Sequence, residues 1–151
     1  MARVYDKNDV FWSYEGDFDL DERGDLRDTS FDSLRSIKQE ILTRIMSSLS
    51  DWRYSPGVGS DMYSFVGQKN TREVGQALRK VITNSLMYDN LINIGDVDVK
   101  IVPISANSVA GQVILNYLPT RRNAVSLPVT LSFLYDYIDN QIFSREGSFS
   151  K

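Results

Sequence analysis

The chain contains neither histidine nor cysteine, and these two absences limit the chemistry available to it. Without histidine it lacks the side chain that most often acts as a general base near neutral pH. Without cysteine it lacks a thiolate nucleophile and the softer metal ligands. The remaining carboxylates, hydroxyls and amines show no spacing typical of a nucleophile beside its base. We therefore expect a protein that is not an enzyme and that needs no cofactor.

Long apolar runs and concentrated positive charge are also missing. No stretch approaches the ~20 apolar residues that span a bilayer, and the acidic start does not resemble a signal peptide. The densest basic cluster is Arg121-Arg122, which is small for a nucleic-acid surface. The net charge is −3, and ten of the 20 acidic side chains lie in residues 1–32. We expect synthesis in the cytoplasm and binding to neither membrane nor nucleic acid.

Acidic residues at alternate positions from Asp17 resemble the start of a calcium-binding loop. Numbered from Asp17, such a loop would place Glu22 where the tight turn needs glycine and Asp28 where a bidentate glutamate is expected. Phe18 and Leu20 alternate with the acidic residues, which is typical of a strand with one solvated face. The pattern therefore favours an extended segment without a metal ion.

Two segments have the period of amphipathic helices. Apolar residues at steps of three and four predict a helix over 31–49, with capping residues at 28–30. A second apolar stripe over 74–86 predicts a helix with Asn70 as N-cap and Glu73 three residues later.

After Gly95 the period changes from 3.6 to two, which predicts strands. The first begins at Val97, and others are expected over 112–118 and 125–134. Pro128 cannot donate a ladder hydrogen bond, so it indicates that the third strand lies at an edge or carries a bulge.

The order of these elements predicts an α+β fold: two long N-terminal helices joined by a structured turn, followed by a small antiparallel β-sheet. We expect an acidic N-terminal arm over 1–28, a single domain over 29–134 and a C-terminal tail over 135–151. The tail remains too apolar for a simple solvated end.

Aromatic residues gather between the two helices and in the N-terminal arm. Trp52 and Tyr54 are followed closely by Tyr63 and Phe65, and aromatic residues are enriched at protein interfaces. Some of these side chains could equally cover the end of the core. In the arm, we expect contacts with a partner protein through Phe11, Trp12, Tyr14 and Phe18.

Three motifs carry a resemblance to a known family. They are GDFDLDERGDL before the first helix, DWRYSPGVGSDM after it, and Asn70-Thr71 at the start of the second. Over residues 16–134 the chain resembles the baseplate wedge, or sheath-initiator, proteins of contractile phage tails and their type VI secretion relatives. In that family an acidic residue with an aromatic or basic neighbour precedes a Pro-x-x-Gly turn. The matching residues, with aspartate where glutamate is usual, are Asp51, Trp52, Arg53, Pro56, Gly57 and Gly59.

The resemblance implies a structural protein of the virion tail baseplate, present in six copies around the tail axis. Its partners would be other wedge proteins and the tail sheath protein, with the tail tube or hub as a further possibility. We expect a sheath strand to be added to the sheet, with first choice of edge at Val97, Asp98, Val99, Lys100 and Ile101 and second choice at 125–134. The alternatives are a baseplate-associated, lysozyme-like cell-wall hydrolase and a free-standing adaptor for protein interactions.

Overall fold

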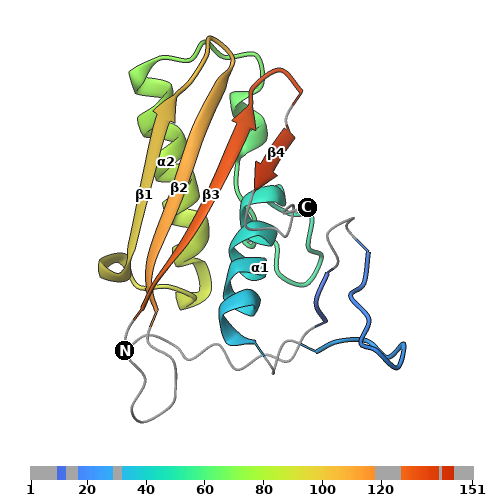
Figure 1. The fold of residues 1–151 in the computed structure, drawn as a ribbon. Helices are drawn as coiled ribbons and strands as arrows, with labels where there is room; N and C mark the ends of the chain where they lie inside the picture. Colours follow the sequence, from blue (N-terminus) through green and yellow to red (C-terminus); the bar gives the residue numbers. More distant parts are fainter. Residues whose placement is uncertain (1–9, 13–16, 29–31, 118–126, 140, 145–151) are drawn as a thin grey trace.

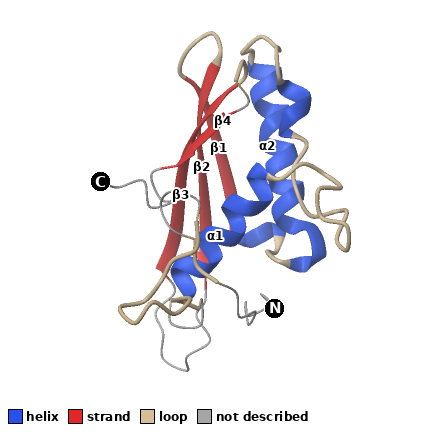
Figure 2. Ribbon diagram, turned by 90° about the vertical axis from the view of Figure 1, so that its right-hand side faces the viewer, coloured by secondary structure: helices blue, strands red, loops and turns tan. Residues whose placement is uncertain are grey.

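The computed structural model describes residues 10–12, 17–28, 32–117, 127–139 and 141–144. Its main elements are two α-helices and one four-stranded antiparallel sheet, with the strands in sequence order. The helices cover one face of this sheet (Figures 1 and 2). The elements are α1 Ser33–Met46, η2 Met62–Phe65, α2 Arg72–Met87, η3 Tyr88–Asn90, η4 Ile94–Asp96, β1 Val97–Pro103, β2 Ser108–Tyr117, β3 Leu127–Asp136 and β4 Gln141–Ser144.

The expected α+β class with an antiparallel sheet after the helices is confirmed, but the helices are not both long and N-terminal. Helix α1 has 14 residues rather than the 19 expected over 31–49. It begins after Asp32, whose carboxylate accepts a hydrogen bond from the Arg35 N–H. The backbone is already extended at Ser47, so the helix ends before Leu49.

Helix α2 begins one residue later than predicted because Thr71, not Asn70, is its N-cap. The Thr71 hydroxyl accepts a hydrogen bond from the Val74 N–H. Asn70 instead donates from its side-chain amide to the carbonyls of Ser105 and Ser108. Asn70 therefore holds the loop that joins β1 to β2.

One hydrophobic core lies between the helices and the sheet. Alternate strand residues point inward, and Val99, Val113, Leu131 and Tyr135 are almost fully buried. The helices contribute residues at helical spacing, namely Ile37, Ile41 and Ile45 from α1 and Leu78, Ile82 and Leu86 from α2. These residues share the predicted apolar stripes, so periodicity identified the buried face of each helix correctly.

Pro128 predicted that the third strand lies at an edge or carries a bulge. β3 instead lies between β2 and β4, and its register with β2 is continuous from Leu127 to Asp136. The short β4 pairs only with Phe133–Asp136, so it does not reach Pro128. The Tyr137 N–H donates to the Asn107 carbonyl, so the odd-numbered backbone N–H groups of β3 point toward β2. Pro128 has an even number, and its nitrogen therefore points away from β2. Proline is thus tolerated at a position where no ladder bond to β2 is lost.

Gly111 in β2 makes room for a core aromatic ring. It pairs with Phe133 across the ladder, and a Cβ at this glycine would overlap the Phe133 ring. Phe133 is itself buried. The absence of a side chain at Gly111 therefore allows the ring to lie close against β2.

Candidate protein-interaction surfaces

The segment after α1 folds into a compact turn held by its own backbone. Ser60 donates from its backbone N–H to the Ser47 carbonyl and from its hydroxyl to the Ile45 carbonyl, both at 2.7 Å. Gly59 has φ of +130°, and a Cβ there would lie 2.6 Å from the Ser48 carbonyl oxygen. Glycine is therefore required where the two ends of the turn approach each other.

Asp51 and Trp52 of the family-like motif stabilise this turn. The Asp51 carboxylate accepts a hydrogen bond of 2.7 Å from the Ser48 N–H, and the Trp52 indole N–H donates to the Ser47 hydroxyl. Ring atoms of Tyr88 pack against Gly57, where a Cβ would overlap them. The motif thus lies in a locally ordered turn, and Asp51 makes its bond within the turn itself.

Several large apolar side chains of this region project into solvent. Tyr54 is 91% exposed, and the Arg53 guanidinium lies 5.7 Å from the centre of its ring. Trp52 and Tyr63 are also exposed, whereas Phe65 is buried in the core. Both readings of the aromatic cluster therefore apply, with Phe65 structural and the others available for contact.

The N-terminal segment is defined as residues 10–28, and its described residues, 10–12 and 17–28, have local order. Its three extended stretches meet in a ring of backbone bonds: Phe11 N–H donates to Arg27, Arg27 N–H to Asp19, and Asp19 N–H to Phe11. The bridges Trp12 to Phe18 and Leu20 to Leu26 extend this arrangement. These bridges give the described stretches the extended character that the alternation predicts.

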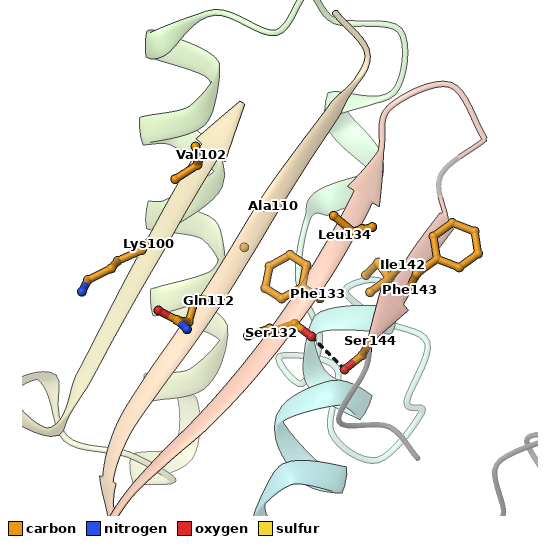
Figure 3. Close-up of a pocket in the computed structure, with 11 residues that line it drawn as sticks. Lys100, Val102, Ala110, Gln112, Ser132, Phe133, Leu134, Ile142, Phe143 and Ser144 are labelled. Atoms are coloured by element: carbon orange, nitrogen blue, oxygen red, sulfur yellow. Dashed lines mark hydrogen bonds between the residues drawn. The ribbon is translucent and has the colours of Figure 1, made fainter. Parts of the chain in front are cut away.

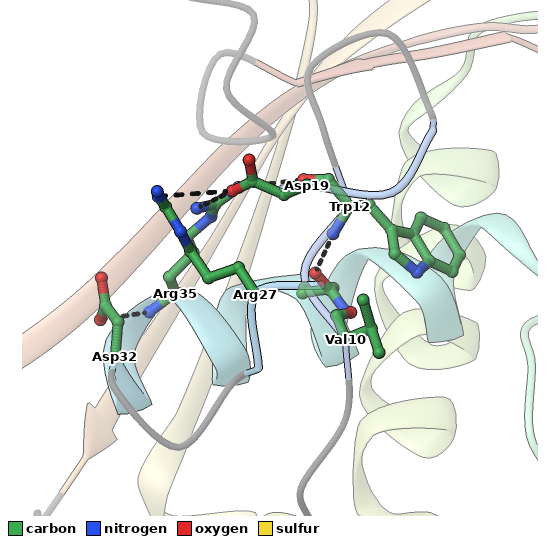
Figure 4. Close-up of polar contacts among 7 residues, drawn as sticks. Val10, Trp12, Asp19, Arg27, Asp32 and Arg35 are labelled. Atoms are coloured by element: carbon green, nitrogen blue, oxygen red, sulfur yellow. Dashed lines mark hydrogen bonds and ion pairs between the residues drawn. The ribbon is translucent and has the colours of Figure 1, made fainter. Parts of the chain in front are cut away.

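Polar groups of α1 hold the N-terminal segment in place (Figure 4). Arg35 donates to the Asp19 carboxylate at 2.7 Å and to the Trp12 carbonyl at 3.0 Å. Gln39 exchanges two further bonds, accepting from the Trp12 N–H and donating to the Val10 carbonyl. These contacts join backbone groups of the segment to two side chains of α1.

The four aromatic residues expected to contact a partner have different environments. Phe11 is only 1% exposed and lies beneath the Arg35 guanidinium, at 4.3 Å from the ring centre. This corrects the expectation of an outward-facing Phe11. Trp12 and Phe18 are exposed, together with Leu20 and Leu26, while Tyr14 lies outside the described residues.

Strand β1 has one free edge. It pairs with β2 on one side, and among the described residues no strand pairs with its other side. The Ile104 N–H donates to Ser108, so alternation directs the even-numbered amides of β1 toward β2. The N–H and C=O groups of Val97, Val99 and Ile101 consequently point outward, and Pro103 lacks an N–H at the next outward position.

Charged side chains flank this edge. Asp98 forms ion pairs with Arg79 of α2 at 3.3 Å and with Lys100 at 3.9 Å. All three side chains are about half exposed, so each pair is worth no more than about 1 kcal/mol. The edge is therefore accessible, with only weak ionic contacts to rearrange.

The second choice of edge, residues 125–134, is open in part, because β4 covers the outer side of β3 only from Phe133 onward. β3 pairs with β2 along its whole length and with β4 from Phe133 onward. Residues 125 and 126 lie outside the described part of the chain. The described residues thus leave β1 as the longer open edge.

The face of the sheet opposite the helices contains a groove with a volume of about 610 Å³ (Figure 3). Val102, Leu134 and Phe143 are exposed beside it. The Ser144 hydroxyl donates to the Ser132 carbonyl and fixes β4 at its margin. The polar side chains of the lining are Lys100, Gln112, Ser132 and Ser144.

Two tyrosines, Tyr135 and Tyr137, have a raised pKa. Burial, followed by the nearby Tyr137 and Asp136, raises the pKa of Tyr135 to about 12. Burial also raises the pKa of Tyr137, whose ring meets that of Tyr135 edge to face at 5.2 Å. The Tyr135 hydroxyl donates to the Met62 carbonyl, so this pair belongs to the core. Hydrogen bonds from the Ile138 N–H and the Ser108 hydroxyl lower the pKa of Asp136.

Arg44 is a structural residue that the sequence reasoning missed. Its side chain is 3% exposed, pairs with Glu40 at 2.8 Å and donates to the carbonyls of Ser85 and Tyr88 at the end of α2. Carbonyls at the C-terminal end of a helix carry partial negative charge, so a cation is well placed there. The available signal was the position of Arg44 on the apolar face of α1, beside Ile41 and Ile45.

The structure keeps the predicted sites apart. The N-terminal segment contacts Arg35 and Gln39 in the first half of α1. The aromatic turn, defined as residues 47–63, follows the last residue of α1. Strand β1 lies at the far side of the sheet from α1 (Figure 1). We therefore describe three separate surfaces rather than one site.

The chain matches no protein-family model, no curated protein and no solved structure. Among the described residues, no cluster of acidic side chains is suited to a metal ion. No described helix has the length and apolar character needed to cross a membrane.

Proposed function

We propose that this chain is a structural subunit of a contractile phage tail baseplate. In this proposal it joins neighbouring wedge proteins, stands in six copies around the tail axis beside the tube or hub, and receives a strand from the tail sheath protein. The order of elements and the family-like motifs support the assignment. Its location would be the virion, after synthesis in the host cytoplasm.

The free edge of β1 is the observation that carries the proposal. Val97, Val99 and Ile101 offer outward N–H and C=O groups on a strand of seven residues. An extended segment from another protein can pair with such an edge, and main-chain hydrogen bonds then fix its register. A subunit that begins a polymer needs this kind of positional control over the first incoming subunit.

The aromatic turn supports contacts with wedge proteins. Trp52, Tyr54 and Tyr63 are exposed on a segment whose backbone is held by hydrogen bonds to Ser47 and Ser48. Rigid aromatic side chains bury a large area on binding with little loss of conformational entropy. We assign this turn to the wedge neighbours.

The N-terminal segment supplies a second contact surface, and its acidic residues indicate what kind of partner surface would bind to it. Trp12, Phe18, Leu20 and Leu26 are exposed among acidic residues. An apolar surface with a basic rim would complement it.

Binding of the tail sheath protein to two variants at one position tests the proposal. Ile101→Pro removes an outward N–H while leaving the bonds from β1 to β2 in place. Ile101→Val keeps that N–H and serves as the control. We expect only the proline variant to lose sheath binding, provided both melt cooperatively. Equal binding by two folded variants would show that β1 does not receive the sheath.

A further inference from the structure

The charges on β1 are complementary to those on a second copy of the same strand. Asp98 and Lys100 lie on either side of Val99, and strand alternation places both on the side of the strand opposite to the buried Val99 side chain. In an antiparallel pair centred on Val99, each Asp98 would stand opposite Lys100 of the second copy. Two ion pairs then form, related by a twofold axis.

The backbone geometry suits the same register. Val99 presents its N–H and C=O outward, so two copies of Val99 can exchange both bonds at the axis. Val97 and Ile101 also present outward N–H and C=O groups. In this register Val97 of each copy faces Ile101 of the other copy. Asp98 and Lys100 then fall at positions between the bonded pairs, where cross-strand side chains come closest.

Neighbouring registers are less favourable. A pair centred on Asp98 would oppose two carboxylates, and one centred on Lys100 would oppose two ammonium groups. In a register shifted by one residue, the outward N–H and C=O groups of one copy would lie opposite residues of the other copy whose backbone groups point toward its own β2. Charge and hydrogen bonding therefore select the register centred on Val99.

We propose that β1 is an interface between two copies of this chain, which join their sheets into one continuous sheet of eight strands. The interface would further bury Val97 and Ile101, which are only partly covered beside the core. Asp98 would exchange its exposed contact with Arg79 for one with Lys100 of the second copy, or share both. This inference is independent of the proposed function. If both hold, the second copy and the sheath strand compete for one edge.

Sedimentation velocity of the full chain over a concentration series measures the dimer. We expect Lys100→Asp to weaken dimerisation about tenfold or more, because each cross-strand pair becomes two carboxylates. Lys69→Asp makes the same charge change at an exposed site outside the sheet and should have no effect. The double variant Asp98→Lys with Lys100→Asp should restore the dimer. A monomer at every concentration, an unaffected Lys100→Asp dimer or a double variant without rescue overturns the proposal.

Disulfide formation between two single-cysteine variants tests the register separately, and the chain has no cysteine of its own. When Asp98→Cys and Lys100→Cys proteins are mixed and oxidised, the two thiols face each other and the second ion pair remains. We expect cross-linked heterodimers from the mixture and few from either variant alone. Absence of the cross-link, or equal amounts in all three samples, contradicts this register. Unchanged thermal melting of the reduced proteins confirms that they are folded.

Discussion

The sheet domain and the N-terminal segment both pack against α1, but they are held by different forces. Beneath the sheet, Ile37, Ile41 and Ile45 belong to a continuous apolar core. Among its described residues the N-terminal segment has one fully buried apolar side chain, Phe11, and these residues otherwise make polar contacts with Arg35 and Gln39. Apolar burial scales with the area removed from water, whereas a partly exposed ion pair such as Arg35 with Asp19 contributes less. The domain should therefore remain folded when the segment is released.

The largest effect is expected inside the domain, from Arg44→Ala. Removing the guanidinium takes a donor from the Ser85 and Tyr88 carbonyls and breaks the ion pair with Glu40. We expect the free energy of unfolding to fall by about 3–5 kcal/mol. Chemical denaturation measures the change. Lys38→Ala, on the same helix but only partly buried, is the control and should cost much less.

Gly111→Ala should destabilise the domain by about 1–3 kcal/mol, because the added Cβ overlaps the Phe133 ring. Denaturant unfolding of the single and double variants tests this cause. Combining Gly111→Ala with Phe133→Leu should cost less than the sum of the single changes. Strict additivity would mean that the two positions do not compete for space.

The two core tyrosines, Tyr135 and Tyr137, differ in whether their hydroxyl groups are hydrogen-bonded, so removing each hydroxyl should have a different effect on stability. Tyr135→Phe removes a donor from the Met62 carbonyl and should cost about 1 kcal/mol or more. Among the described residues the Tyr137 hydroxyl has no partner, so Tyr137→Phe should be neutral or stabilising. Thermal melts of both variants distinguish them, and an equal loss would contradict these assignments.

The raised pKa of Tyr135 also predicts that the free energy of unfolding falls at alkaline pH. Its folded pKa of about 12 lies above the ordinary value of 10.0, so the unfolded chain releases the proton first. The stability that Tyr135 contributes is complete below pH 10 and is lost as pH rises toward 12. Unfolding at several pH values should therefore show a shallower alkaline decline for Tyr135→Phe than for wild type. Parallel declines would contradict the shift.

The smallest global effect is expected for Arg35→Ala, which releases the N-terminal segment. The change removes the ion pair with Asp19, the bond to Trp12 and the contact over Phe11. We expect a loss below about 1 kcal/mol for the domain but faster proteolysis within residues 10–28. Limited digestion with mass spectrometry reads this out. Unfolding of the whole chain would show that the segment belongs to the core.

Local patterns in the sequence predicted the helices and three strands, because burial on one face leaves a period of 3.6 or two. Strand β4 was missed because its four residues are too few to show alternation. The choice of Thr71 over Asn70 as cap depends on the distant carbonyls of Ser105 and Ser108, which no local pattern reveals.

The candidate surfaces were predicted less completely than the fold. Composition marked the aromatic residues of the N-terminal segment but could not show that Phe11 turns inward while Trp12 turns outward. The outer side of the edge at Val97 has no strand partner among the described residues, and its pairing with a sheath strand stays a prediction. Its exposure depends on strand order, which pairs residues far apart in the sequence.

Hydrogen exchange at the backbone amides of Val97, Val99 and Ile101 tests the proposed role of β1 most directly. The comparison is between baseplates that lack sheath and baseplates that carry the first sheath ring. A sheath strand added to β1 would bond these three outward amides, and their exchange should slow. The amides of Asp98 and Lys100 already bond to β2 and serve as internal controls. Unchanged exchange at all three outward amides, with the sheath attached, would contradict strand addition at this edge.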